Sequence, residues 1–156
     1  MFPAKKIVCP TDFSDASLQA LASATAIAAH NDAEVYLVHV IPVSLGTADR
    51  CMPITVPEYE RFLQPQRRLE QIAEPLAAKG LKTQIVLGRG DAASEIVRIA
   101  KEKGADVIVI ATHGNTGWRH FAFGSVTEKV VRLACCAVLT IRAKATTTEK
   151  AASSPK

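Results

Sequence analysis

Apolar and polar positions along this chain follow two periods that alternate as far as about residue 142. Short apolar runs, typical of strands, are separated by longer segments whose apolar residues recur at steps of three and four, as on one helix face. The predicted strands are residues 6–10, 33–41, 81–87, 105–110 and 137–142. The predicted helices begin after Ser14, near Pro65, after Asp91 and at Ser125.

Residues between these segments predict where the elements begin and end. Ser14 and Asp91 have side chains that suit helix N-caps. We expect Pro65 and Pro75 to start or kink the second helix, because proline has no N–H to donate. We also expect residues 88–91 to form a turn and residues 42–57 to form a long loop.

Strands that alternate with helices predict the α/β class, here a single doubly wound, Rossmann-like domain. Its sheet would be parallel, with right-handed crossovers and helices on both faces. Within the predicted strand 105–110, the continuous apolar run at 107–110 is typical of a strand buried on both faces, whereas 81–87 alternates like an edge strand. Ligands of such sheets bind beyond the carboxyl ends of the strands, where strand order reverses.

Composition and charge narrow the function classes. The 156 residues are 48% apolar and 22% charged, as in an ordinary globular domain, which we place at residues 1–142. Residues 143–156 are a low-complexity tail. No apolar run approaches the roughly 18 residues that span a bilayer, and no secretory signal is visible, so we expect a cytoplasmic protein that does not enter membranes. The net charge is +4, but the basic residues are scattered, and we expect no nucleic-acid binding.

The cysteines and one histidine give two further expectations. The cysteines show no metal-ligand spacing, and we expect buried, reduced thiols and no metal site. We expect His39, near the end of the second strand, to be packed and hydrogen-bonded.

The segment that follows the fourth predicted strand carries the candidate chemistry. Glycines punctuate a loop that ends at a Ser125-x-x-Glu128 helix start. A strand, a glycine loop and a helix N-terminus together favour a phosphate site, because backbone N–H groups and the helix dipole face the anion. Two other interpretations stay open at this point. In one, the glycines serve turns while Ser125 and Glu128 form a capping box; in the other, Asp12 is a turn residue or a helix cap.

Several motifs, in the right order, resemble those of the universal stress protein family. The family pattern G-x2-G-x9-G-[ST] matches Ala111, Gly114 and Gly124–Ser125. Further matches are 10–14, 38–40, 104–109 and 134–139, so that the resemblance covers nearly all of residues 4–142. The chain departs from the pattern at Ala111, where the family has its first glycine. A methyl group there would loosen binding if the ligand needs a close approach, and costs nothing to the backbone if φ is negative.

The resemblance implies the strand order 3-2-1-4-5 and an adenine nucleotide, ATP or AMP, as ligand. Asp12 would contact the ribose and adenine region, and the backbone of Val40 the adenine edge. Residues 111–117 would wrap the ribose and phosphates, and residues 124–127 would hold the phosphates. The implied binding residues are Pro10, Thr11, Asp12, Val40, Ala111, Thr112, His113, Gly114, Asn115, Thr116, Gly117, Gly124, Ser125, Val126 and Thr127. Mg²⁺ would arrive only with bound ATP.

We therefore expect a stress-response protein that binds nucleotide as a sensor or adaptor, with no catalytic residues and at most slow ATP hydrolysis. The resemblance also implies a homodimer through the apolar edge strand 137–142. One alternative is a nucleotide-free homodimeric interaction protein. Another is an ATP-dependent adenylating enzyme, but such enzymes carry S-G-G-x-D-S after the first strand, where this chain has Cys9–Ser14.

Overall fold

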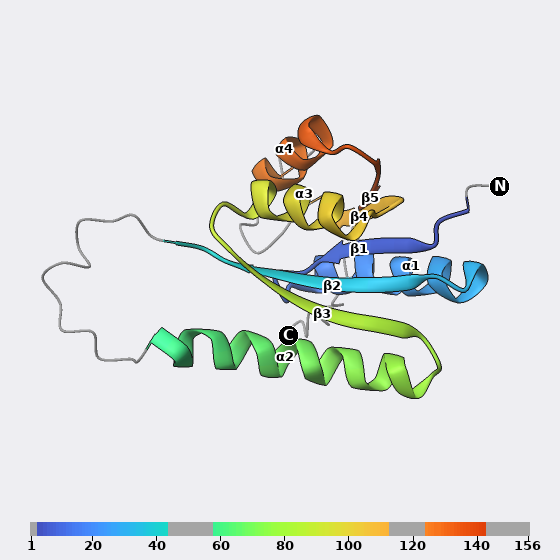
Figure 1. Ribbon diagram of the computed structural model, residues 1–156, viewed down its shortest axis with the longest axis horizontal. Helices are drawn as coiled ribbons and strands as arrows, with labels where there is room; N and C mark the ends of the chain where they lie inside the picture. Colours follow the sequence, from blue (N-terminus) through green and yellow to red (C-terminus); the bar gives the residue numbers. More distant parts are fainter. Residues whose placement is uncertain (1–2, 44–57, 113–123, 143–156) are drawn as a thin grey trace, which may run out of the picture.

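A computed structural model describes residues 3–43, 58–112 and 124–142, of which 58–62 as backbone only. Five parallel strands form one sheet in the order β3-β2-β1-β4-β5, which confirms the predicted fold class and order (Figure 1). The strands are β1 (Lys6–Pro10), β2 (Glu34–Ile41), β3 (Lys82–Arg89), β4 (Val107–Ala111) and β5 (Ala137–Ile141). The helices are α1 (Asp15–Asn31), α2 (Glu58–Ala78), α3 (Ala92–Lys103) and α4 (Ser125–Leu133).

Side chains of the central strands alternate between two apolar layers, because successive residues of a strand point to opposite faces. Ile7 and Cys9 of β1 pack in the layer beneath α1 and α2, while Val8 between them packs beneath α3 and α4. All three are fully buried. Figure 1 shows α2 running alongside β3 and α3 lying next to α4. β1 is therefore enclosed on both faces and on both edges, by β2 and β4.

The predicted helix N-caps at Ser14 and Asp91 are confirmed. The Ser14 hydroxyl accepts a hydrogen bond from the Ser17 amide at 3.2 Å, and Asp91 accepts one from the Ser94 amide at 3.0 Å. Each side chain satisfies one of the N–H groups that a helix start leaves without a partner. Within the described residues, no helix is both long and apolar enough to cross a membrane.

The second helix differs from its prediction. It begins at Glu58 and continues through Pro65 and Pro75, so neither proline starts it. Each proline removes one backbone donor, but Leu69 is fully buried and Ile72 and Leu76 pack against the same core layer. This packing offsets the lost hydrogen bonds, because tertiary contacts supply most of the stability of a protein helix.

The third strand is also longer than predicted, because Gly88 and Arg89 continue it instead of forming a turn. Gly88 lies opposite Val40 in the β2–β3 register. A Cβ atom on Gly88 would lie 3.2 Å from Glu95 Oε2 and 3.2 Å from Val40 Cγ2. The absence of a side chain at this position lets α3 approach the sheet closely.

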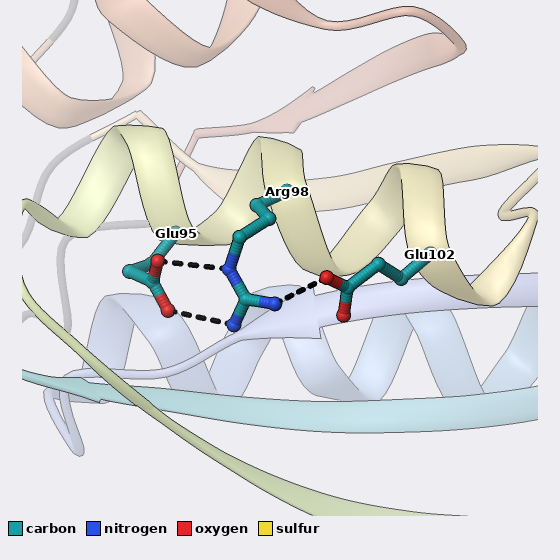
Figure 2. A network of polar contacts seen from close by, with 3 residues as sticks. All are labelled: Glu95, Arg98 and Glu102. Atoms are coloured by element: carbon teal, nitrogen blue, oxygen red, sulfur yellow. Dashed lines mark hydrogen bonds and ion pairs between the residues drawn. The ribbon is translucent and has the colours of Figure 1, made fainter.

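Glu95 is held at this place by a polar network on α3 (Figure 2). The Arg98 guanidinium donates to both Glu95 oxygens, at 2.9 and 2.8 Å, and also to Glu102. The hydrogen bonds from Arg98 lower the pKa of the Glu95 carboxyl. Because Arg98 is half-exposed, we assign the network an orienting role and little stability.

We predict that Gly88→Val lowers the free energy of unfolding by about 1–3 kcal/mol, the usual cost of forcing extra atoms into a packed site. Urea denaturation followed by circular dichroism measures this change. Gln84→Val, at an exposed position of the same strand, is the control and should change stability much less. Equal effects of the two substitutions would contradict the close approach of α3.

Candidate functional site

A pocket of about 380 Å³ lies at the carboxyl ends of β1, β2 and β4, between the N-termini of α3 and α4. Its volume is in the range of small-molecule sites. Strand order reverses between β1 and β4, which is where doubly wound sheets bind ligands. The pocket is lined by Pro10, Thr11, Asp12, Ser17, Val38, His39, Val40, Ala92, Ile96, Ile110, Ala111, Gly124, Ser125, Val126 and Thr127.

Most of the predicted binding residues that the structure describes line this pocket. They are Pro10, Thr11, Asp12, Val40, Ala111, Gly124, Ser125, Val126 and Thr127. Thr112 is buried beside the pocket without lining it, and its amide donates to the Ile141 carbonyl at 2.9 Å. The predicted residues His113, Gly114, Asn115, Thr116 and Gly117 lie outside the described residues.

The sequence-based prediction missed the lining residues from α1, α3 and the strand interiors. Ala92 and Ile96 are four residues apart and face the pocket from the first turns of α3. Their spacing was a usable signal, because the N-terminal turn of the helix that follows an edge strand lies at the same rim of the sheet. Ser17 lies in the first turn of α1, three residues after its N-cap, and α1 follows the central strand β1 at the same rim of the sheet.

The start of α4 forms one end of the pocket. Its N-cap is Gly124, which has no side chain, and Ser125 is the first residue inside the helix. The alternative in which Ser125 caps the helix with Glu128 is therefore wrong. The Glu128 amide instead makes an ordinary helical hydrogen bond to the Gly124 carbonyl at 3.0 Å. The first turn thus faces the pocket without an N-cap side chain over its N–H groups, an arrangement that favours anions.

Two hydrogen bonds join this helix start to the end of β4. The buried hydroxyl of Thr127 donates to the Ala111 carbonyl at 2.7 Å, and the Gly124 amide donates to the Thr112 carbonyl at 2.6 Å. Ala111 is not among the residues with positive φ, so the alanine in place of glycine brings no backbone strain. These bonds hold the helix N-terminus at a defined place relative to the strand ends.

The loop between β1 and α1 forms the wall of the pocket opposite the start of α4. A series of linked hydrogen bonds holds this loop. The Phe13 amide donates to the Thr11 hydroxyl at 3.0 Å, and the Ser17 hydroxyl donates to the Ser14 carbonyl at 2.8 Å. Since Ser17 has given its only hydroxyl proton, Thr11 Oγ1 must donate to Ser17 Oγ, at 2.9 Å. Such chains strengthen one another in a buried setting, so the loop is rigid.

Asp12 has a structural role in this loop as well as a place on the pocket wall. Its Oδ1 atom accepts hydrogen bonds from the Ser14 amide, at 3.0 Å, and from the Ser14 hydroxyl. The turn-residue interpretation of Asp12 is thus correct. It does not exclude a contact with a ligand, because a carboxylate accepts at both oxygens.

His39 is packed and hydrogen-bonded, as predicted, and it also lines the pocket. Its Nδ1 lies 2.8 Å from the Thr11 carbonyl oxygen. A carbonyl only accepts, so Nδ1 carries a proton and donates it to this hydrogen bond. The ring stacks against Phe13 at a centroid distance of 4.5 Å. Phe13 has φ of 64°, a left-handed conformation that costs about 1–2 kcal/mol for a residue with a side chain.

An ion pair joins the two helices that flank the pocket. Lys129 of α4 donates to Asp91, the N-cap of α3, at 2.7 Å. The hydrogen bond from Lys129, followed by those from Ser94, holds the pKa of the Asp91 carboxyl well below its usual range. The pair is exposed, and its role is to fix the distance between the two helix N-termini.

The cysteines only partly match their prediction. Cys9 is buried, and burial raises the pKa of its thiol to about 12. Cys136 is half-buried, and burial likewise raises its pKa. Cys135 is exposed, contrary to the prediction, because adjacent residues at the entry to β5 point to opposite sides. Cys51 lies outside the described residues. In the described part of the chain, no three His, Cys, Asp or Glu side chains gather as metal ligands would.

The fold and the pocket define a doubly wound α/β protein with a ligand-sized site at its topological switch point. The family model described as the universal stress protein family matches residues 3–142. The chain belongs to this family.

Individual relatives agree with this assignment. Universal stress protein MJ0531 of Methanocaldococcus jannaschii is 38% identical over 140 residues, which cover 88% of this chain and 82% of the relative. The solved structure of MJ0577, from the same organism, is 31% identical with a TM-score of 0.75, and the match covers 92% of this chain and 99% of that one. A universal stress protein from Archaeoglobus fulgidus, solved in complex with dAMP, shares the fold at 23% identity and a TM-score of 0.65, covering 90% and 99%.

We predict that Asp91 makes stability depend on pH. Its pKa is lowered in the folded state, so its contribution is present above the ordinary Asp pKa of about 4 and is lost as the pH falls towards the folded value. Wild type should therefore lose more stability than Asp91→Asn between pH 6 and pH 3, as measured by urea denaturation at each pH. The control Asp15→Asn, which changes an exposed residue in the first turn of α1, should behave like wild type. An identical pH profile for Asp91→Asn and wild type would contradict the prediction.

Proposed function

We propose that this protein binds an adenine nucleotide, ATP or AMP, in the described pocket and acts as a sensor or adaptor in a stress response. The observation that carries the proposal is that one cavity has an apolar end and an end with backbone hydrogen-bond donors. Apolar side chains of Val38, Val40 and Ile96 offer a surface for a base, while the glycine-capped start of α4 offers backbone donors for phosphate. A nucleotide has the same two unlike ends.

The wall formed by β1 and its loop supplies the third requirement, a group for the ribose. Asp12 is a carboxylate at the end of a strand, and carboxylate oxygens accept hydrogen bonds from sugar hydroxyls. We propose that Asp12 contacts the ribose and adenine region and that Val40 meets the base. Residues 111–117 would wrap the ribose and phosphates, and residues 124–127 would hold the phosphates. Mg²⁺ would enter with ATP and be held mainly by phosphates and water.

Two further facts support an adenine nucleotide over a ligand-free pocket. Ala111, the departure from the family pattern, has no positive φ and so does not distort the loop entry. The A. fulgidus relative was solved with dAMP, an adenine nucleotide, in a protein of the same fold. We propose that the nucleotide is a signal and that the protein hydrolyses ATP more slowly than about 1 s⁻¹, the lower end of the range of ordinary enzymes.

The direct experiment is to denature the purified protein and analyse the supernatant by ion-exchange chromatography. Released ATP or AMP supports the proposal. If no nucleotide is released, ATP is added in a thermal shift assay, where a ligand at 100 times its Kd stabilises by about 2.7 kcal/mol. No nucleotide and no thermal shift would leave the alternative, a nucleotide-free interaction protein. Steady ATP consumption above about 1 s⁻¹ would contradict the sensor proposal and would indicate an enzyme.

We predict that Gly124→Val abolishes nucleotide binding without unfolding the protein. Gly124 has φ −69° and ψ 154°, which valine adopts readily, while its side chain would block the approach of phosphate to the helix start. Gly124→Asp sharpens the test, because a carboxylate N-cap leaves stability unchanged or raises it by a few tenths of a kcal/mol yet repels phosphate. Calorimetric titration with ATP and thermal melts measure both effects. Wild-type affinity in either variant would refute the phosphate placement.

We further propose that the protein is a homodimer in which β5 meets a second copy of itself. β5 is an edge strand, and its neighbourhood is apolar: Leu139 is 39% exposed, and Val131 and Leu133 of α4 are 49% and 46% exposed. The opposite edge strand, β3, instead exposes Lys82 and Gln84. An unprotected apolar edge favours pairing with another strand.

We predict that Leu139→Lys converts this dimer into a monomer, because it places a charge in the apolar edge. Size-exclusion chromatography with light scattering measures the mass. Gln84→Lys, which adds the same charge at the other edge of the sheet, should leave the mass unchanged. A wild-type protein of monomer mass at high concentration would refute the dimer while leaving the nucleotide proposal intact.

A further inference from the structure

A stack of three side chains connects α2 to the pocket. The Arg68 guanidinium carbon lies 4.2 Å from the centroid of the Phe13 ring, and that ring lies 4.5 Å from the His39 ring. His39 in turn donates to the Thr11 carbonyl and lines the pocket. Arg68 is exposed and does not line the pocket itself. Any influence of Arg68 on the pocket must therefore pass through Phe13 and His39 or act through its charge at a distance.

We propose that Arg68 is a positioning residue that sets the nucleotide affinity of the pocket by clamping Phe13 against His39. The inference rests on the proposed function, because the affinity it concerns is that of the proposed nucleotide site. It adds a determinant on α2, a helix whose described side chains, from residue 63 onward, do not line the pocket.

The clamp acts on the backbone between Asp12 and the start of α1. Phe13 stands between Asp12, on the pocket wall, and Ser14, the N-cap of α1. Its φ of 64° is uncommon for a residue with a side chain, so the surrounding contacts must hold it. Those contacts include the hydrogen bond from the Phe13 amide to the Thr11 hydroxyl, the packing of Phe13 on the core layer under α1 and α2, and the contacts of its ring with the Arg68 guanidinium and the His39 ring. Release of the ring would let the backbone relax and move the Asp12 carboxylate away from its place.

Arg67 provides a matched control for the charge of Arg68. The two arginines are adjacent on α2 and both are exposed, but the ring of Phe13 lies under Arg68. A general attraction between a basic helix and an anionic nucleotide would respond similarly to the loss of either charge. A clamp would respond only to the loss of Arg68.

The experiment is calorimetric titration of the full chain, freed of bound nucleotide, with ATP. Arg68→Met should weaken binding about two- to fivefold, the loss expected from one exposed cation–π contact, and Arg67→Met should leave it unchanged. Arg68→Lys, which keeps a cation over the ring, should restore most of the affinity. Phe13→Leu should weaken binding, and the further change Arg68→Met in that background should add nothing, because the two residues act as a unit.

The outcomes separate this inference from the proposed function. Wild-type affinity in Arg68→Met, equal losses in Arg67→Met and Arg68→Met, or additive losses in the double variant would each overturn the clamp while nucleotide binding stands. Failure of wild type to bind ATP would overturn the proposed function and the inference together. NMR spectra of the nucleotide-free protein give an independent readout. The His39 ring resonances should shift in Arg68→Met and stay in place in Arg67→Met, and unchanged resonances in both would also overturn the clamp.

Discussion

The enclosure of β1 by β2 on one side and β4 on the other is the constraint on which the rest of the structure depends. The chain moves in one direction along the sheet from β1 to β2 and in the other direction from β4 to β5, so right-handed crossovers place the intervening helices on opposite faces: α1 packs in one apolar layer and α4 in the other. The segments that leave β1 and β4 diverge at the carboxyl ends of these strands, and a gap remains between them. The pocket is thus a consequence of strand order and buried alternation.

Within that gap, the start of α4 is unlike the starts of α1 and α3. Those two helices are capped by the side chains of Ser14 and Asp91, which take up N–H groups of the first turn. α4 begins at a glycine, and it is fixed to the sheet by the hydroxyl of Thr127 and not by a cap. Its position is therefore defined while its N–H groups keep their capacity to bind an anion. This difference is the reason that the proposed function assigns the phosphates to the start of α4 and not to the starts of α1 and α3.

The parts that could be predicted from sequence depend on local periodicity, and the parts that could not depend on contacts between distant segments. The buried run of β4, the edge position predicted from the sequence alternation of β3, and the caps at Ser14 and Asp91 depend on local patterns, and the structure confirms them. The strand order came from family resemblance. The prediction that the second helix starts near Pro65 was wrong, because the packing of Leu69 on the sheet outweighs the backbone hydrogen bonds that the two prolines remove. Phe13 and Arg68 are far apart in the sequence, and no local pattern indicates that they are in contact.

Phe13 itself shows why such long-range contacts matter for a binding site. A glycine would adopt φ of 64° without strain, and this is the residue that a local rule would place there. Glycine, however, has no ring to lie between His39 and Arg68, and it would leave the loop free to sample other conformations. The backbone of Phe13 is strained, but its ring gains contacts with both His39 and Arg68, so that the surroundings hold the strained conformation. The wall of the pocket is in this way set before any ligand arrives, which reduces the entropy that binding must overcome.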